Sequence, residues 1–413
     1  YPGFDQAFVE EMKKLCFGAD IILPNITEAC LVTDTPYQET YDQAYVQGLL
    51  DALTARGAKT VVLTGGGTGG HVTSNIALIP YLRKKGYRVC YVGSEKGMEK
   101  SLIEPLGIPY YGIDSERLNR YFTLENLTMP FHVISGLFQA RRLLGKLKPD
   151  VVFSKGGFVS VPVVIAAHWR KIPCVCHESD ITPGLANKLA MPFASKVCVN
   201  FQDALRYVPQ GKGVYTGTPI RDSLLSGSRS QGLAISGLSA DRPVLLVMGG
   251  SSGARALNEG VRQALPSLLP HFQVLHLCGK GNWDESLAGQ EGYFQIEYAN
   301  EEMPHFYAAA DVTLCRAGAN SLAEILALRL PNVLVPLPLS ASRGDQILNA
   351  RSFTEKGYSY TLEQEKLSPE RILAAVEEVY RNRDRYRQAM DRDQQESGTQ
   401  RVLEVIEEAM ASK

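Results

Sequence analysis

The sequence lacks several features that would each assign it to a class of protein. It has no apolar run near the roughly 20 residues that a membrane-spanning helix needs, since the longest are runs such as residues 161–167. Its charge is not of one sign, because 43 Lys and Arg residues face 44 Asp and Glu residues. The basic surface that is typical of nucleic-acid-binding proteins is therefore not expected. We expect a soluble protein that can still touch a membrane.

Cysteine is present, but not in a pattern that binds metal. The eight cysteines form no Cys-x-x-Cys pair, and several, such as Cys90 and Cys198, lie in apolar runs that are typical of buried strands. We interpret them as reduced core residues of a cytosolic protein. Cys174 and Cys176 share one face of an expected strand, with only the adjacent His177 as a further ligand-like residue. We assign no metal, and we recognise no secretory signal peptide.

From about residue 59 onward, short β-branched runs alternate with longer amphipathic stretches. The alternation is typical of a parallel sheet with helices on both faces. It restarts after a Ser- and Gly-rich break near residues 215–242, so we predict an α/β protein with two doubly wound, Rossmann-like domains in series. The expected strands are 59–64, 88–92, 151–154, 173–176, 196–200, 243–248, 273–277, 293–297, 312–315 and 332–335, the helices between them include 72–85 and 159–170, and the tail 368–413 is helical.

The domain boundaries follow from this alternation. We expect an N-terminal domain over 59–221, a linker region over 222–242, a C-terminal domain over 243–390 and a C-terminal helix over 391–413. Residues 1–58 do not form a complete unit of the same kind. Their one convincing strand at 20–23 and helical flanks at 5–14 and 43–56 are too few to bury both faces of a sheet.

Three glycine clusters join expected strands to expected helices. The first runs from Gly65 to Gly70 and satisfies G-x-G-x-x-G, a dinucleotide fingerprint that is weak alone. The second holds Gly156 and Gly157, and the third, residues 249–253, opens the second domain. Glycine lets a ligand approach the backbone, and helix N-termini donate hydrogen bonds to anions. Three such turns at the carboxyl ends of strands predict a phosphate-bearing ligand between the domains.

Several polar side chains lie beside these turns. His71 follows the first cluster and is a candidate base, although a His there could simply help to cap the helix. Glu324, one turn into a helix, could accept hydrogen bonds from ribose hydroxyls or merely favour the helix dipole. Asp345, Gln346 and Asn349 open another helix, where they could read sugar hydroxyls. Residues 391–393 match an Asp-x-Asp metal motif, but they lie in a charge-dense helix, so we prefer a solvated face.

These motifs resemble those of the MurG family, the bacterial peptidoglycan N-acetylglucosaminyltransferases. The resemblance covers residues 59–413 and rests on residues 64–72 (TGGGTGGHV), 154–162 (SKGGFVSVP), 177–189 (HESDITPGLANKL), 216–221 (TGTPIR), 248–258 (MGGSSGARALN), 315–326 and 344–350 (GDQILNA). It implies the GT-B arrangement, in which two Rossmann-like domains face a cleft. It also implies inverting transfer of GlcNAc from UDP-GlcNAc to the MurNAc 4-hydroxyl of lipid I, which forms lipid II. No cofactor besides the donor and no Asp-x-Asp metal is implied.

The resemblance also implies roles for individual residues. His71 would deprotonate the acceptor hydroxyl, and Glu178 is the second catalytic candidate. The UDP-GlcNAc site would comprise Thr68, Gly69, Gly70, Asn187, Arg221, Ser252, Gly253, Ala254, Glu324, Asp345 and Gln346. The acceptor and its diphosphate would lie against Gly66, Gly67, Gly156, Gly157 and Phe158. Some members of the family have Tyr at position 158 and Gln at position 345.

The resemblance implies partners and a location as well. The partners are UDP-GlcNAc, lipid I, and proteins of cell-wall synthesis or division, with no nucleic acid. The location is peripheral, at the cytoplasmic face of the bacterial inner membrane. Residues 124–148 support this, since they are amphipathic with a basic end (Arg141, Arg142, Lys146 and Lys148) that suits an anionic membrane. The apolar side chains of this stretch could instead pack on the sheet.

Residues 1–64 resemble another family, the bacterial pyridoxal (pyridoxamine) kinases of the ribokinase superfamily. The resemblance rests on residues 19–30 and 57–65, and Asn25 with Glu28 matches an Asn-x-x-Glu element associated with Mg-phosphate binding. The substrate-binding start and the Gly-Asp catalytic region of a kinase are absent, so we expect no kinase activity. We interpret the chain as a chimera, with an incomplete ribokinase-like α/β fragment before the transferase; the alternative is a native extension.

Three other functions remain open. Another UDP-sugar-dependent lipid glycosyltransferase would share the same loops. An NAD-binding oxidoreductase would fit the first loop, but it leaves His71 and the turn at residues 249–255 unexplained. In a catalytically impaired chimera, the N-terminal fragment would obstruct folding or the cleft.

Overall fold

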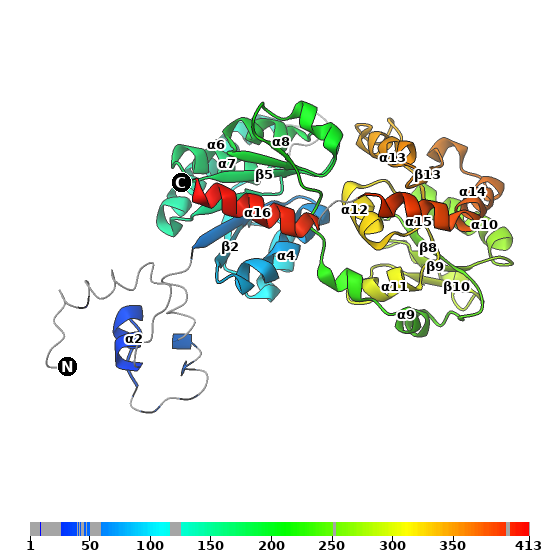
Figure 1. The fold of residues 1–413 in the computed structure, drawn as a ribbon, viewed down its shortest axis with the longest axis horizontal. Helices are drawn as coiled ribbons and strands as arrows, with labels where there is room; N and C mark the ends of the chain where they lie inside the picture. The colour runs from blue at the N-terminus through cyan, green and yellow to red at the C-terminus, as the bar shows by residue number, and fades with distance from the viewer. Residues whose placement is uncertain are drawn as a thin grey trace.

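The computed structural model describes residues 59–115, 125–250, 253–393 and 397–412, with 9, 26–38, 40, 42, 45–46 and 48–49 before them. Two parallel sheets with packed helices follow one another along the chain (Figure 1). The predicted α/β fold with two doubly wound domains is confirmed.

The first sheet has seven strands in the order β3-β2-β1-β4-β5-β6-β7, all parallel to their neighbours. Every residue of the central strands β1, β4 and β5 is buried, as expected for strands covered on both faces. The strand order reverses between β1 and β4, so the loops after these two strands lie side by side. The strands are β1 Thr60–Thr64, β2 Arg88–Ser94, β3 Tyr110–Ile113, β4 Val151–Ser154, β5 Cys174–Glu178, β6 Lys196–Val199 and β7 Gly213–Tyr215. The helices are α4 Gly69–Lys84, α5 Met98–Ile103, α6 Glu125–Leu147, α7 Ser160–Trp169 and α8 Leu185–Ala190, with short 3₁₀ turns η1 Glu104–Leu106, η2 Met191–Phe193 and η3 Gln202–Tyr207.

The second sheet has six parallel strands in the order β10-β9-β8-β11-β12-β13. Its strands are β8 Val244–Met248, β9 Gln273–Leu277, β10 Tyr293–Ile296, β11 Val312–Cys315, β12 Asn332–Leu334 and β13 Tyr360–Thr361. Its helices are α9 Arg229–Ser236, α10 Arg255–Leu268, α11 Met303–Ala309, α12 Ala319–Leu328, α13 Asp345–Glu355, α14 Pro369–Arg381 and α15 Arg383–Asp391, with η4 Asp222–Ser226, η5 Glu285–Leu287 and η6 Gln364–Lys366.

All the strands predicted from residue 59 onward form, with ends within two residues of the prediction. Three strands were not predicted: β3, β7 and β13. All three lie at sheet edges, and each contains exposed or half-exposed residues instead of a buried β-branched run. The helix predicted at 72–85 begins earlier, at Gly69, with the extended Thr68 as its N-cap residue.

The last helix, α16 Gly398–Ala411, returns to the first domain (Figure 1). Its residues Val402 and Ile406 share a buried core with Val61 and Phe153. Lys85 at the end of α4 also forms an ion pair with Glu407, with 2.7 Å between Nζ and Oε1. The C-terminal helix therefore completes the core of the N-terminal domain. The predicted linker region at 222–242 contains α9, which packs against α11. The domain boundaries themselves stay predictions.

The region before the first sheet is described only in part. The helix α2 Ile26–Thr33 contributes Ala29 and Cys30 to a small buried cluster with Leu49. The helix predicted at 5–14, apart from helical Val9, the strand predicted at 20–23 and Asn25 lie outside the described residues. Of the helix predicted at 43–56, the described residues 45–46 and 48–49 are helical.

Candidate active site

The carboxyl ends of the two sheets meet at the contact between the domains. Ser74 in the helix after β1 donates a hydrogen bond to Asn320 Oδ1, which follows β11, over 3.5 Å. Asn349 Nδ2, which follows β12, donates to Asp180 Oδ1, which follows β5, over 3.0 Å. The loops that the glycine motifs predicted as a ligand site therefore face the second domain, as in other doubly wound proteins.

His71 lies in the first turn of α4, with its ring oriented by the glycine loop before it. Its Nδ1 atom is 2.8 Å from the carbonyl oxygen of Gly66. A carbonyl oxygen only accepts, so Nδ1 carries the hydrogen and Nε2 keeps its lone pair. Burial and the Lys155 charge lower the pKa of His71, whereas the Gly66 hydrogen bond, Asp180 and Glu99 raise it. A neutral imidazole with a free Nε2 atom is the form that a general base requires.

The first two glycine loops dock backbone to backbone. The Gly66 N–H donates to the Gly156 carbonyl over 3.3 Å. A side chain at Gly157, whose φ is +89°, would overlap the Gly66 carbonyl. Only glycine satisfies both the close approach and the left-handed backbone at this position. The predicted acceptor residues Gly66, Gly156 and Gly157 are therefore brought together, with exposed Gly67 and half-buried Phe158 beside them.

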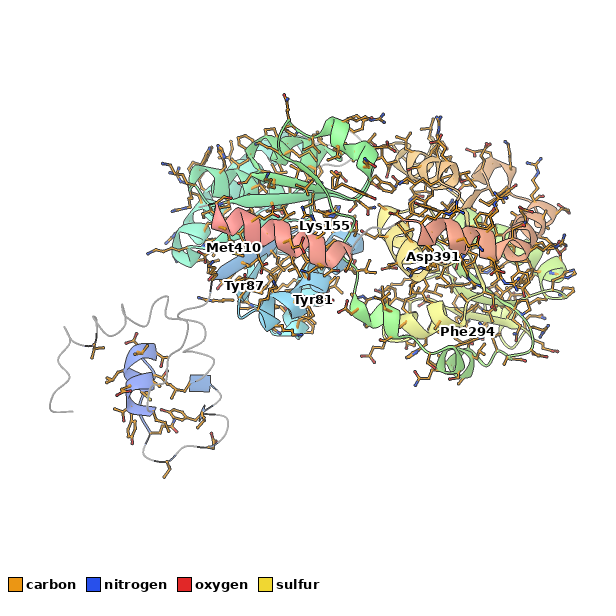
Figure 2. All side chains as sticks on the ribbon, in the orientation of Figure 1. Tyr81, Tyr87, Lys155, Phe294, Asp391 and Met410 are labelled. Carbon is orange, nitrogen blue, oxygen red and sulfur yellow. The ribbon has the colours of Figure 1, made fainter. Side chains whose placement is uncertain are left out.

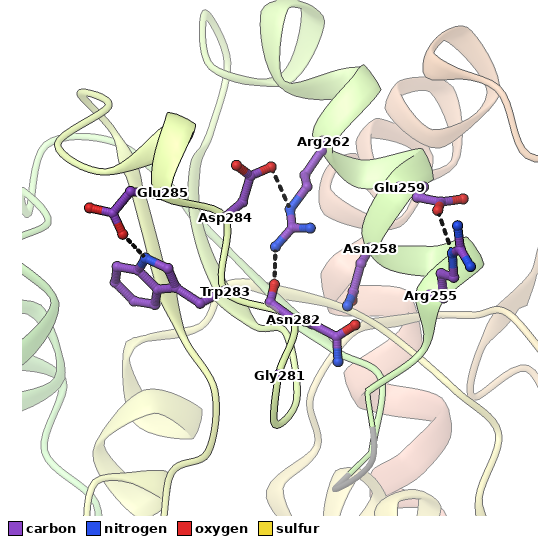
Figure 3. Close-up of a pocket in the computed structure, with 9 residues that line it drawn as sticks. All are labelled: Arg255, Asn258, Glu259, Arg262, Gly281, Asn282, Trp283, Asp284 and Glu285. Carbon is purple, nitrogen blue, oxygen red and sulfur yellow. Dashed lines mark hydrogen bonds and ion pairs between the residues drawn. The ribbon is translucent and has the colours of Figure 1, made fainter.

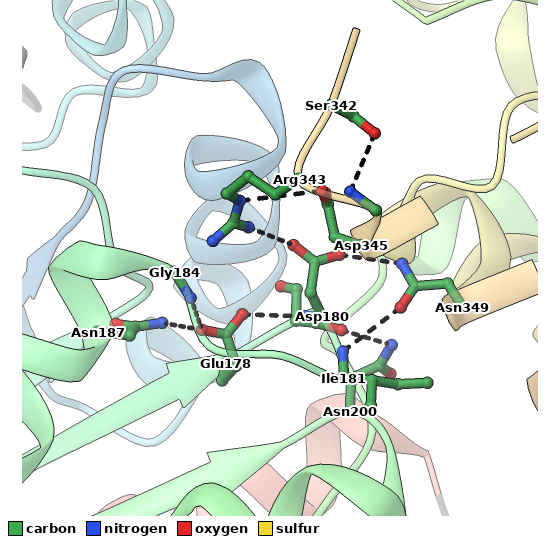
Figure 4. A network of polar contacts seen from close by, with 12 residues as sticks. Glu178, Asp180, Ile181, Gly184, Asn187, Asn200, Ser342, Arg343, Asp345 and Asn349 are labelled. Atoms are coloured by element: carbon green, nitrogen blue, oxygen red, sulfur yellow. Dashed lines mark hydrogen bonds and ion pairs between the residues drawn. The ribbon is translucent and has the colours of Figure 1, made fainter. Parts of the chain in front are cut away.

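Glu178 is the predicted second catalytic residue, and its carboxylate is engaged within its own loop (Figure 4). Its Oε1 atom accepts from the Asp180 N–H over 2.9 Å. Its Oε2 atom accepts from the Gly184 N–H over 3.0 Å and from Asn187 Nδ2 over 2.9 Å. The side chain is buried. These contacts fix the shape of the loop after β5, and they bring Glu178 and Asn187 together as the sequence predicted.

The predicted sugar-binding residues at the start of α13 lie beside this loop (Figure 4). Arg343 lies between two carboxylates, with nitrogen–oxygen distances of 3.9 Å to Asp180 and 3.8 Å to Asp345. Gln346 Oε1 accepts from the Leu337 N–H over 3.1 Å, which closes the loop before the helix. Burial, followed by the charge of Glu178, raises the pKa of Asp180 to about 6.

The predicted nucleotide-binding residues lie in the second domain and its approach. The Tyr307 hydroxyl donates to Glu324 Oε2 over 2.6 Å. Burial raises the pKa of Glu324, and the nearby Arg221 charge lowers it, so these two predicted residues are close enough to interact. Gly253 has a φ of +72°, and a side chain there would contact the Cys278 carbonyl and Asn282. Ser252 lies outside the described residues.

The N-terminus of α4 holds three further predicted residues. Thr68 is the exposed N-cap, and Gly69 and Gly70 form the first positions of the helix. A side chain at Gly70 would overlap the amide of Asn320 from the second domain. Gly70 therefore lies directly at the contact between the domains.

An open pocket of about 460 Å³ lies elsewhere, between α10 and the loop after β9 (Figure 3). Its charged side chains pair with one another: Arg255 with Glu259 over 2.8 Å and Arg262 with Asp284 over 3.8 Å. The Trp283 indole N–H donates to Glu285 over 3.0 Å. Because these groups already have partners, we assign no site residue to this pocket.

The Asp-x-Asp match at residues 391–393 forms contacts within the fold. Asp391 pairs with Arg329, and Asp393 accepts a hydrogen bond from the Tyr358 hydroxyl over 3.1 Å. Within the described ranges, no group of three or more His, Cys, Asp or Glu side chains has the arrangement of a metal site.

Comparison with known proteins identifies the family. The sequence model of the glycosyltransferase family 28 N-terminal domain matches residues 61–199, and that of the C-terminal domain matches residues 244–406. The chain is 54% identical over 350 residues to the UDP-N-acetylglucosamine--N-acetylmuramyl-(pentapeptide) pyrophosphoryl-undecaprenol N-acetylglucosamine transferase of Lachnospira eligens. This match covers 85% of this chain and 99% of the relative. The corresponding transferase of Clostridium tetani is 50% identical over 355 residues, with 86% and 99% covered. The chain belongs to this family of transferases.

Solved structures agree with this assignment. The crystal structure of Acinetobacter baumannii MurG superposes with a TM-score of 0.66 at 28% identity, over 85% of this chain and 99% of that one. The UDP-GlcNAc 2-epimerase of Neisseria meningitidis, bound to UDP-GlcNAc, superposes with a TM-score of 0.58 at 13% identity, over 84% and 100%, and shows the shared fold alone. The predicted GT-B fold is thereby confirmed.

The sequence analysis did not single out two charged groups that lie at the candidate site. Asp180 was not singled out, although it lies inside the matched motif at 177–189 and contacts the second domain. Lys155 was quoted only as part of a glycine loop, yet it is 1% exposed, and its ammonium group lies 2.7 Å from His177 Nδ1. A lysine placed directly before two glycines at the end of a buried strand was the available signal.

Proposed function

We propose that His71 is the base of the transfer reaction in this chain. The chain is a glycosyltransferase that transfers GlcNAc from UDP-GlcNAc to undecaprenyl-diphospho-MurNAc-pentapeptide. The single observation that supports the role of His71 is its tautomer, since the Gly66 carbonyl holds the hydrogen on Nδ1 and leaves Nε2 with a lone pair.

The proposed role of His71 implies the following reaction. Nε2 of His71 takes the proton of the MurNAc 4-hydroxyl, and the oxygen attacks the anomeric carbon of GlcNAc. A bond forms between that oxygen and carbon while the bond between the carbon and the UDP oxygen breaks, with inversion. The negative charge develops on UDP, where we expect the N-terminus of α10, just after Gly253 and Ala254, to stabilise it.

The remaining predicted residues divide between the two substrates. On the donor side, Glu324 binds the ribose, Asp345 and Gln346 bind the GlcNAc hydroxyls, and Arg221 and Ser252 bind the diphosphate. The effect of the Arg221 charge on the pKa of Glu324, which it lowers, is consistent with this division. On the acceptor side, the docked loops around Gly66 and Gly157 bind the lipid diphosphate. Glu178 and Asn187 hold the loop between the two sites in shape.

We propose that the reaction needs no metal ion. The helix N-terminus and Arg221 would supply the charge that a metal supplies in other transferases. Transfer is expected to be unchanged when EDTA replaces Mg²⁺ in the assay. A loss of transfer with EDTA that Mg²⁺ restores would contradict this.

We propose that α6 and α7 form the surface that rests on the membrane. Ile134 and Phe138 of α6 and Trp169 of α7 are all about half exposed or more. Arg141 and Arg142 of α6 and Arg170 just after α7 are exposed, and the Arg141 guanidinium lies 5.7 Å from the Trp169 ring centre. This combination suits the anionic face of the inner membrane.

Three apolar residues of the predicted amphipathic stretch pack inward and not on that surface. Leu144 is buried, and Leu137 and Leu143 pack against the core. The side chains of Leu127 and Phe131 lie outside those described. Among the described helices, none has the length and apolar character that a membrane span needs.

Residues 1–58 are proposed to be a kinase-like fragment without a role in transfer. Two alternatives remain: a different lipid acceptor for the transferase, and a fragment that obstructs the enzyme. One experiment separates them, namely transfer of labelled GlcNAc from UDP-GlcNAc to a short-chain lipid I analogue by the full chain, residues 59–413 and His71→Ala. Equal transfer by the first two and a large loss in His71→Ala are expected. If residues 59–413 transfer GlcNAc and the full chain does not, the N-terminal fragment obstructs the enzyme. If neither protein transfers GlcNAc although both are folded and bind UDP, the acceptor assignment is contradicted.

A further inference from the structure

Lys155 is a buried cation of the first domain and directly follows β4 (Figure 2). Its backbone N–H donates to the Thr64 carbonyl over 2.9 Å, which joins it to the end of β1. Its Nζ atom lies 2.7 Å from Ser179 Oγ and 2.7 Å from His177 Nδ1. One residue therefore links the ends of three neighbouring strands, β1 through its backbone N–H and β5 through its side chain.

His177 is arranged to accept from this lysine. Its Nε2 atom lies 2.7 Å from the Gly217 carbonyl oxygen, which can only accept, so Nε2 carries the hydrogen. Nδ1 then has a lone pair that points at the ammonium group of Lys155. Burial and the Lys155 charge hold the pKa of His177 well below its usual value, so the ring stays neutral. The pair is an ammonium donor and an imidazole acceptor.

A buried charge is costly unless other groups compensate for it, so its retention here calls for a reason. Burial lowers the pKa of Lys155 to about 7, while the carboxylates of Glu178 and Asp180 act in the opposite direction. An apolar side chain of similar length would fill the same space without this cost.

We infer that Lys155 is a positioning residue for the transfer reaction: it joins the ends of β4 and β5 beneath the glycine loops, and its ammonium charge acts on His71. The inference rests on the proposed function in one respect, namely the role of His71 as the base.

A chain of contacts connects Lys155 to His71. Gly156, the next residue, accepts the Gly66 N–H over 3.3 Å, and the Gly66 carbonyl accepts the His71 Nδ1 hydrogen over 2.8 Å. A side chain at Gly65 would lie 3.3 Å from the Lys155 Cβ atom, so the two loops are in contact at that point. Moving Lys155 would therefore move the carbonyl that sets the tautomer of His71.

The charges that face His71 come from three elements. Asp180 follows β5 and Glu99 lies in α5, and both carboxylates raise the pKa of His71. Lys155, after β4, is the cation among them and lowers that pKa, in the same direction as burial. From the second domain, the neighbour of the loop is the uncharged Asn320. Without Lys155, two carboxylates would favour a protonated His71, which is useless as a base.

The test is a titration of the histidine rings of the full chain by NMR. The seven histidines are labelled with ¹³C in the ring, and His71→Gln identifies the His71 signal. In Lys155→Met and Lys155→Gln, the His71 midpoint is expected to rise by about one pH unit, a typical effect of one nearby charge. The acid limb of the kcat/KM profile is expected to move to higher pH by the same amount.

Three variants complete the design. Lys155→Gln removes the charge but keeps an N–H donor for His177. It therefore provides the same test if Lys155→Met destabilises the fold. Lys155→Arg keeps the charge and is expected to leave the midpoint unchanged. Lys85→Met removes a charge at the far end of α4, about 20 Å along the helix from His71, and is the control for net charge.

Each outcome decides something. An unchanged His71 titration midpoint in folded Lys155→Gln would overturn the inference. A His71 midpoint above about 6.5, the ordinary histidine value, in the unaltered chain would overturn it as well. A midpoint that moves while the acid limb of kcat/KM stays would support the action of Lys155 on His71 and contradict the proposed role of His71 as base.

Discussion

Asn349 of the second domain donates a hydrogen bond to Asp180 of the first, with 3.0 Å between Nδ2 and Oδ1. Asn349 also contacts the Ala317 carbonyl over 3.2 Å and the Ile181 N–H over 3.4 Å. One buried amide therefore connects the loop after β11 to the loop after β5. The relative position of donor and acceptor sites depends on contacts of this kind.

The buried Asp180 carboxyl predicts a specific dependence of stability on pH. Its pKa is raised to about 6, chiefly by burial, so the folded protein binds its proton more tightly than the unfolded chain does. The contribution of Asp180 to stability is therefore fully present below about pH 4, the unfolded value, and is lost as pH rises through about 6. The substitution Asp180→Asn replaces the carboxyl with an amide that does not ionise, so this loss of stability with rising pH is not expected in the variant.

The measurement is the thermal midpoint of Asp180→Asn minus that of the unaltered chain, from pH 4 to pH 7. This difference in thermal midpoint is expected to grow with pH. The corresponding change in the free energy of unfolding is on the order of 2 kcal/mol. Asp203→Asn, at an exposed site, is the matched control and is expected to give a flat difference. A flat difference for Asp180→Asn would show that its carboxyl is not perturbed.

Glu324 is expected to determine the affinity for UDP. Glu324→Ala removes the carboxylate that the Tyr307 hydroxyl holds in place at 2.6 Å. We expect the Kd for UDP to rise by about 10- to 100-fold, since hydrogen bonds to charged groups contribute roughly 1.5–3 kcal/mol. Tyr307→Phe, which keeps the carboxylate, is expected to have a smaller effect.

Isothermal titration calorimetry with UDP measures this prediction. Glu285→Ala, which alters the pocket of Figure 3, is the control and is expected to leave the Kd unchanged. Normal UDP binding by Glu324→Ala would exclude Glu324 from the nucleotide site.

The docking of the first two glycine loops predicts a contrast between two substitutions. Both Gly157 and Gly67 have positive φ angles, +89° and +79°, so alanine is strained at either position. A Cβ atom at Gly157 would overlap the Gly66 carbonyl, whereas one at Gly67 would have nothing within 4 Å. Gly67→Ala should cost only the backbone strain of about 1–2 kcal/mol. Gly157→Ala should lower the thermal midpoint further and raise the KM for the lipid acceptor. Equal midpoints for the two variants would contradict the docking.

The return of α16 to the first domain predicts where its mutations act. Ile406 is fully buried in the core that contains Val61 and Phe153. Ile406→Ala is expected to cost about 2–5 kcal/mol, as for other buried Ile truncations. Hydrogen exchange should become faster in β1 and β4 and remain unchanged in β8 and β11. Faster exchange in β8 and β11 instead would place the helix with the second domain.

The sequence predicted the fold because buried parallel strands have a simple signal. Runs such as Val151–Ser154 are mostly apolar and buried throughout, and the glycine turns after them mark the carboxyl edge of the sheet. The edge strand β13 Tyr360–Thr361 has no such run, because its outer side needs no apolar cover. The destination of α16 was not predictable, since its apolar stripe would fit either domain.

Residues of the candidate site could be predicted only where they lie in or beside a recognisable sequence motif. His71 was found because it follows a glycine loop, but the carbonyl that orients its ring belongs to Gly66, and no spacing rule specifies that contact. The roles of Lys155 and Asp180 depend on burial and on partners after other strands. Such contacts arise from tertiary packing, so a local pattern does not contain them.

The central claim is that His71 removes the proton of the acceptor hydroxyl. The most direct measurement is a single-turnover rate of GlcNAc transfer to a short-chain lipid I analogue by His71→Gln, with the Kd for UDP-GlcNAc measured in parallel. The account predicts a rate lower by about 100-fold or more, the usual contribution of a general base, with an unchanged Kd. A rate within a few-fold of that of the unaltered chain would contradict it.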